Sequence, residues 1–341
     1  MKRTRTIAAT LAVLLAVIMV RLPAGGSDII SPSPDQVVFP GQAPRAVSEG
    51  VLTAYDQTLS RKYNDALDTC REMGALLPES PAGPTGEMVI YQVMMLENED
   101  YAWDSEFRDA ADRAVSRAKV FAENAPRNDW YYTMLGAAWG IQGIYYLRQD
   151  EYLSGLYYGV RGLNHMQKAH EINPENWEAA MGVGLYLYYR SAYSRFIPLP
   201  WLDQREKGIE LVRKAGENRP YLFEISQIAL YYIYMNEEDY DRARSYITPL
   251  IEERPDFPVF HHFCGRAMLA KGDLDEAARH YMDMHEVDAD LYLPYYKLAV
   301  IRHRQGMDEE AREWLEGFFK TLGDRDSIYR DDARDLMTRI R

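Results

Sequence analysis

Histidines are the residues of this chain that come closest to metal-ligand spacing. Two pairs lie five positions apart on expected helices: His165 with His170, and His280 with His285. At about 3.6 residues per turn, this spacing separates two side chains by about 140°, whereas two metal ligands on one helix need a spacing of four. His261 and His262 are adjacent and therefore point in different directions on a helix. We therefore expect no metal site and no cofactor.

Catalytic motifs are also missing from the sequence. It contains no His-Glu-x-x-His, no Gly-x-Ser-x-Gly, no phosphate-binding glycine loop and no paired cysteine motif. Acidic residues gather at Glu97, Glu99, Asp100 and Asp104. We interpret this cluster as a solvated helix end rather than as an acid/base pair. The sequence therefore predicts no catalytic residues, and the protein is expected not to be an enzyme.

The composition is that of a soluble globular protein with an acidic surface. Hydrophobic residues make up 47% of the 341 residues and charged residues 27%, with a formal net charge of −13. Because phosphate binding needs a basic footprint, this charge argues against nucleic acid as the main partner. Tyrosine is abundant, with 26 copies against 10 of phenylalanine. Its apolar ring and polar tip suit half-buried helix surfaces and binding grooves.

The elements that must position any site are helices that end in a proline. The pattern starts with a small residue, followed four positions later by an apolar residue, three positions later by an apolar or small one, and five positions later by a proline. It recurs in four places: Ala66, Cys70, Met73 and Pro78; Gly162, Met166, Ala169 and Pro174; Gly208, Val212, Ala215 and Pro220; Ala243, Ile247, Leu250 and Pro255. Offsets of four and three place residues on one helical face, and proline cannot continue a helix. One such hairpin cannot bury its own apolar face, so neighbouring hairpins must stack.

The preceding helices carry a second set of recurring residues. On these first helices they are the pairs Leu135-Gly136, Val183-Gly184 and Cys264-Gly265. Two turn-and-helix segments, 272–277 and 306–311, match the inter-helix signature, and Tyr63 and Tyr240 each lie three residues before the small residue of a second helix. With these motifs, the chain from about Ser48 to Arg341 resembles the tetratricopeptide repeat (TPR) superfamily. The resemblance implies an all-α, TPR-like solenoid of antiparallel helical hairpins in a right-handed superhelix. It also implies a protein that usually holds partners and usually does no chemistry.

Three hairpins exceed the usual repeat length. In the units that close at Pro126, Pro174 and Pro220, roughly a dozen extra residues separate the two helix signatures. Shared between two helices, these residues would lengthen each by about 9 Å. In the middle unit, glycines recur on both helices at positions 136, 140 and 143 and at 155, 159 and 162, which predicts close backbone packing. Residues 173–189 and 204–215 resemble a bacterial cell-envelope subgroup of TPR proteins with an enlarged central hairpin.

The chain divides into four expected segments. Residues 1–26 carry basic residues before an apolar run at 7–20, which predicts a cleaved export signal with a cut before Ser27 or an uncleaved membrane anchor. A proline-rich linker follows at 27–46, the repeat domain at 47–325 and an amphipathic capping helix at 326–341. Inward positions of that helix are expected at Ile328, Ala333, Leu336 and Ile340. We expect an exported protein of the bacterial periplasm or cell envelope, either released or held at the inner membrane by residues 7–20.

Both cysteines occupy apolar stripe positions. Cys70 lies in the first repeat and Cys264 in a late one. Because solenoid repeats touch only their neighbours, their Cα atoms should not reach the separation of about 7 Å that a disulfide tolerates. We expect both to be small core residues.

The resemblance also implies where a partner would bind. In TPR proteins, the first helices of the hairpins line the concave surface along which the ligand lies. Carried onto this chain, the groove positions are Trp130, Thr133, Tyr188, Tyr189, Tyr232, Asn236, His262, Arg266, Tyr296, His303 and Arg304. This wall would suit an extended peptide with apolar side chains and an acidic end, unless the enlarged helices curl inward and pack the aromatic rings. A second candidate is the apolar loop at 196–202, with Phe196, Ile197, Leu199 and Trp201; it either contacts a partner or folds back over the long hairpin.

Three functions are compatible with these features. The first is a non-catalytic envelope scaffold or adaptor that binds a protein or peptide in the groove. The second is an exported glycan-binding module, or less readily a glycan-cleaving one, because tyrosine and tryptophan faces stack on sugar rings. The third is a membrane-tethered assembly or export factor. The sequence names neither the partner nor the oligomeric state.

Overall fold

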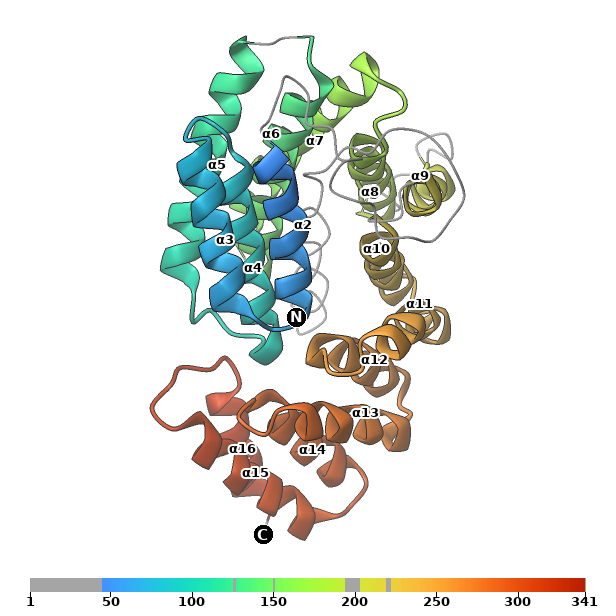
Figure 1. The fold of residues 1–341 in the computed structure, drawn as a ribbon. Helices are drawn as coiled ribbons and strands as arrows, with labels where there is room; N and C mark the ends of the chain where they lie inside the picture. Colours follow the sequence, from blue (N-terminus) through green and yellow to red (C-terminus); the bar gives the residue numbers. More distant parts are fainter. Residues whose placement is uncertain (1–44, 125–126, 150, 194–202, 219–221, 341) are drawn as a thin grey trace. The chain divides into compact units, whose positions relative to one another are not determined.

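The computed structural model describes residues 45–124, 127–149, 151–193, 203–218 and 222–340. Within these ranges the chain forms α-helices joined by short connections and contains no strand (Figure 1). The predicted export segment, the linker up to residue 44 and the apolar loop with Phe196, Ile197, Leu199 and Trp201 lie outside the described residues. None of the described helices is long and apolar enough to cross a membrane.

The first of two compact units contains the described residues up to Gln92 and those of Ser105–Ile233. Its helices are α2 (Arg45–Leu59), α3 (Tyr63–Leu76), most of α4 (Ala82–Asn98), α5 (Asp104–Asn124), α6 (Asp129–Arg148), α7 (Tyr152–Ile172), α8 (Trp177–Tyr193), α9 (Arg205–Asn218) and most of α10 (Phe223–Asn236). Consecutive helices pair as hairpins, α2 with α3, α6 with α7 and α8 with α9, and α7 also packs on α8.

The second unit contains Val93–Asp104 and Tyr234–Arg341. It holds the last turns of α4, the end of α10 and six further helices: α11 (Tyr240–Glu253), α12 (Pro258–Lys271), α13 (Leu274–Val287), α14 (Leu293–Arg304), α15 (Asp308–Leu322) and α16 (Arg330–Arg339). Hairpins form between α12 and α13 and between α14 and α15, and they stack through α11 on α12 and α13 on α14.

The proline-ended stripe predicted from the sequence is confirmed. Helices α3, α7 and α11 each end two residues before Pro78, Pro174 and Pro255. The stripe positions of these helices and of α9 are buried: Ala66, Cys70, Met73, Gly162, Met166, Ala169, Gly208, Val212, Ala215, Ala243, Ile247 and Leu250. Cys70 and Cys264 are buried free thiols, as predicted. The local helix period thus placed these residues on buried faces.

The enlarged middle hairpin is also confirmed. Its helices α6 and α7 have 20 and 21 residues, against 14 in each of α11, α12 and α13. A Cβ atom added to Gly143 would lie 2.7 Å from the backbone nitrogen of Gly159, and one added to Gly162 would lie 2.8 Å from the carbonyl oxygen of Gly136. The glycines therefore let the two backbones approach closely. In the third enlarged unit α9 keeps 14 residues, so its second helix is not lengthened.

The C-terminal helix covers the end of the second unit. Ala333, Leu336 and Ile340 are buried against α14 and α15, as expected for a cap. The prediction for Ile328 was wrong, because α16 begins only at Arg330 and Ile328 lies exposed in the preceding turn. The helical hairpins, their stacking and the proline-ended second helices together form an all-α, TPR-like solenoid architecture.

Candidate functional site

The predicted groove residues of the first unit lie inside the protein. Trp130, Thr133, Tyr188, Tyr189 and Tyr232 are all buried. The Tyr188 hydroxyl donates a hydrogen bond of 3.1 Å to the carbonyl of Ile233, and the Tyr188 and Tyr189 rings meet edge to face at 4.9 Å. Their burial favours the alternative in which the aromatic rings pack inside the helices rather than line an open wall.

Thr133 belongs to a hydrogen-bond network at the turn that joins α7 and α8. The side-chain amide of Asn176 donates to Asp129 Oδ2 and to Thr133 Oγ1, each at 2.9 Å. Asn173 donates to the same carboxylate oxygen at 2.9 Å. The network ties the start of α6 to this turn, so Thr133 acts in folding and offers no free group to a ligand.

The predicted groove residues of the second unit differ in exposure. His262 and Arg266 are buried, Asn236, Tyr296 and His303 are partly buried, and Arg304 is exposed. His303 Nδ1 lies 2.7 Å from Asp308 Oδ1, which places this histidine in a local pair at the end of α14. These residues therefore do not form one continuous exposed surface.

A buried charge cluster surrounds Glu99, which follows the last turn of α4. Its carboxylate is only 11% exposed and has Lys297 Nζ at 3.1 Å, His262 Nε2 at 3.2 Å and Arg266 Nη1 at 3.9 Å. The Tyr329 hydroxyl also donates a hydrogen bond to this carboxylate. The expectation that Glu99 lies at a solvated helix end was wrong, because 93–104 packs within the second unit.

The electrostatics of this cluster are those of a buried ionic network. Burial alone would raise the pKa of the Glu99 carboxyl, but Lys297, His262 and Arg266 outweigh burial and hold that pKa well below its usual range. Burial lowers the pKa of His262, against the raising effect of Glu99. Burial and the Glu99 charge raise the pKa of Tyr329 well above its usual range. Glu99 thus stays ionised and held by its neighbours, which suits a structural role.

The residues on either side of Glu99 hold the start of α14. The Asn98 side-chain oxygen accepts hydrogen bonds from the backbone nitrogens of Tyr292 at 2.9 Å and Leu293 at 3.2 Å. Asp100 Oδ2 accepts a 2.8 Å hydrogen bond from the Tyr292 hydroxyl. Asn98, Glu99 and Asp100 therefore connect the turn after α4 to the C-terminal hairpins through these hydrogen bonds and ion pairs.

An exposed apolar surface lies on α7 and was not predicted. Leu153, Leu156, Tyr157 and Val160 are exposed by 86%, 64%, 52% and 39%, and we name these four residues the α7 stripe. Their spacing of three, four and seven residues puts them on one helical face. The opposite face of α7 carries Gly155, Gly162 and Met166, which are buried.

One basic side chain borders the α7 stripe. The guanidinium of Arg161 lies 4.6 Å from the centroid of the Tyr157 ring and 5.0 Å from that of Trp139, and Arg161 itself is exposed. Four large apolar side chains together on a surface indicate a protein interaction site more often than isolated ones do. The sequence contained a usable signal, since the four residues repeat with the helix period on the face opposite the glycines.

Known proteins resemble this chain only in structure. No family model matches the chain, and no curated protein matches its sequence. A tetratricopeptide repeat protein from Parabacteroides merdae has 13% identity and a TM-score of 0.43, with 87% of this chain and 99% of that chain covered. PilW, a type IV pilus biogenesis factor, has 15% identity and a TM-score of 0.49, with 73% and 98% covered.

A third solved structure is YrrB, a TPR protein with an unusual peptide-binding site. It has 18% identity and a TM-score of 0.39, with 61% of this chain and 93% of that chain covered. At these TM-scores and identities, none of the three structures carries an argument about this chain. By its own stacked, proline-ended helical hairpins, the described chain is an all-α protein of TPR-like fold.

Proposed function

We propose that this protein is a non-catalytic scaffold that binds a partner protein through the α7 stripe. The observation that carries the proposal is the exposure of four large apolar side chains at helical spacing. Fully burying an exposed Leu side chain contributes about 1.5–3 kcal/mol, so Leu153 and Leu156, with smaller contributions from the less exposed Tyr157 and Val160, supply a useful share of a binding free energy. A helix that meets them needs apolar residues at matching positions.

The occupant that fits best is an amphipathic helix with an acidic residue at one end. From Tyr152 to Val160 α7 carries no charged residue, and the first charge on its exposed face is Arg161. A carboxylate of the partner beside Arg161 would bind the in-plane donors of the guanidinium while the ring contacts remain. This charge arrangement fixes the direction in which the partner helix lies.

The other functions expected from the sequence receive less support. Glycan binding depended on open faces of Tyr188 and Tyr189, and both residues are buried. Membrane tethering and an envelope location depend on residues 1–26, which lie outside the described residues. Both stay proposals, and N-terminal sequencing of the mature protein tests them: a start near Ser27 supports export with cleavage, and a start at Met1 or Lys2 supports an anchor.

The binding proposal is tested with a photo-cross-linking amino acid at position 156 of the full chain in its native cells. The matched control carries the same group at 167, an exposed position on the same helix. We expect one protein to be captured at 156 and not at 167, through a peptide that forms an acidic amphipathic helix.

A double variant makes the result decisive. Leu153→Glu with Leu156→Glu should abolish capture by a cross-linker at 157 and leave the circular dichroism spectrum unchanged, because both side chains are exposed. Equal capture with and without these substitutions would refute the proposal. Capture of a second copy of this chain, shown by cross-links between identical peptides, would instead assign the stripe to self-association.

A further inference from the structure

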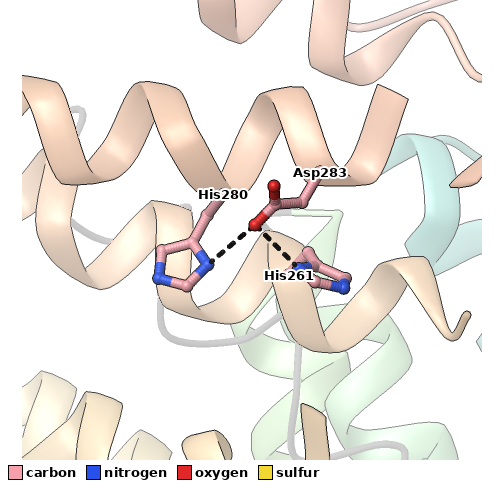
Figure 2. Close-up of side chains that lie close together, drawn as sticks. All are labelled: His261, His280 and Asp283. Atoms are coloured by element: carbon pink, nitrogen blue, oxygen red, sulfur yellow. Dashed lines mark ion pairs between the residues drawn. The ribbon is translucent and has the colours of Figure 1, made fainter. Parts of the chain in front are cut away.

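Three potential metal ligands meet in the second unit. Figure 2 shows His280 and Asp283 projecting from α13 toward His261 on α12. Asp283 Oδ2 lies 3.7 Å from His261 Nδ1 and 4.0 Å from His280 Nδ1, and one donor atom from each residue lies within 4.8 Å of the others. Spacing within one helix gives no signal for this set, because His261 lies on α12 and the other two residues lie on α13.

The tautomer of His261 suits a metal ligand. Its Nε2 lies 2.8 Å from the carbonyl oxygen of Pro255. A carbonyl oxygen only accepts hydrogen bonds, so Nε2 carries the hydrogen and Nδ1 of the neutral ring carries the lone pair. Metal-binding histidines usually donate their other ring N–H to a carbonyl or carboxylate oxygen in this way, because this hydrogen bond orients the ring and selects the tautomer.

The buried nitrogens of this cluster lack the partners that buried polar atoms normally have. Within the described part of the chain, no hydrogen bond is made by Nδ1 of His261 or by either ring nitrogen of His280. Both rings are buried. Since buried polar atoms are nearly always paired, these nitrogens point to a ligand that binds them.

We propose that His261, His280 and Asp283 bind a divalent transition-metal ion such as Zn²⁺. Two imidazoles and a carboxylate are a common ligand set for such ions and leave a coordination position open. In a tetrahedral site, ligand atoms at about 2.1 Å from zinc lie roughly 3.4 Å apart, so the observed 3.7 and 4.0 Å need only small side-chain rotations. Asp283 is 40% exposed, which gives the ion a path from solvent.

The surrounding charges are compatible with a cation. Arg279 and Arg244 are the basic side chains that act electrostatically on His280. The two arginines are ion-paired with Glu276, which offsets their charge. An ion bound here would join α12 to α13 and stabilise that hairpin.

The test uses the full chain without an affinity tag, stripped of metal with a chelator and titrated with Zn²⁺ by calorimetry. We expect one zinc per chain and a rise in melting temperature on zinc addition, since the ion binds the folded state. Asp283→Asn keeps the side-chain shape and should weaken zinc binding at least about tenfold and remove the thermal shift. His280→Ala should do the same.

His303→Ala is the matched control. His303 also lies beside a carboxylate, that of Asp308. Among the described residues, however, this pair has no third potential metal ligand close to it. Its removal should leave zinc affinity unchanged. If the wild-type chain binds no zinc, or if Asp283→Asn binds it as tightly as wild type, the proposal is overturned.

Discussion

Replacing Gly143 by alanine should destabilise the long hairpin of α6 and α7. The new Cβ atom would lie 2.7 Å from the nitrogen and 3.0 Å from the Cα of Gly159, and 3.0 Å from the carbonyl oxygen of Gly155. All three atoms are backbone, so no side chain can rotate away. Unstrained contacts of this kind need about 3.5 Å, so the two helices must move apart by about half an ångström or more.

The magnitude follows from two opposing effects. Alanine in a helix interior is favoured over glycine by about 1 kcal/mol. Overpacking of a tight contact costs about 1–3 kcal/mol, and a clash between two backbones belongs at the upper end of that range. Gly143→Ala should therefore lower the free energy of unfolding by about 1–2 kcal/mol.

Gly159→Ala is the matched control in the partner helix. A Cβ atom at Gly159 would meet no atom within 4 Å, so the helix preference of alanine acts alone. This variant should raise the free energy of unfolding by about 0.5–1 kcal/mol. The two substitutions are chemically identical and differ only in where the methyl group points.

The assay is urea unfolding followed by circular dichroism, with hydrogen exchange of peptides from α6 and α7 to assign the transition to the first unit. We expect opposite shifts of the unfolding midpoint for the two variants. If Gly143→Ala is as stable as Gly159→Ala, the close approach of the two helices is not what the glycines provide, and the reasoning fails.

The remaining predictions concern the Glu99 cluster and the cysteines. Glu99→Gln should lower the free energy of unfolding of the second unit by about 3 kcal/mol, because it leaves buried cations uncompensated. As a control, Asp241→Asn removes one partner of an exposed ion pair and should not shift the urea midpoint measurably. The pKa of Glu99 is lower in the folded than in the unfolded state, so its contribution is present above about pH 4.3 and is lost as pH falls toward the folded value. The gap between wild type and Glu99→Gln in urea unfolding should therefore shrink on acidification, and a gap that widens would contradict the ionised assignment. Burial raises the pKa of both thiols, that of Cys264 to about 12. Neither Cys70 nor Cys264 should therefore react with iodoacetamide at pH 8 until urea unfolds the chain. Fast labelling of the native protein, detected by mass spectrometry, would refute their burial.

Residue patterns within one helix were predicted well. The stripe that contains Ala66, Cys70 and Met73 is buried, and the helix ends before Pro78, because helix period and proline geometry act over a few residues. The same holds for the glycines of the long hairpin, since their spacing alone places them on one face of each helix. Exposure was harder to predict, as the α7 stripe has the same spacing as a buried stripe.

The sequence by itself thus determined the all-α repeat fold, where helices end and which faces they bury, since these properties depend on neighbours along the chain. Only the tertiary structure decided what surrounds each polar group. Glu99 meets Lys297 and Tyr329, and His261 meets Asp283, through packing of helices that no local pattern encodes. Burial and charge at these positions depend on residues far apart in the chain. For that reason Glu99 and Asp100, which the sequence placed at a solvated helix end, are largely buried in the structure.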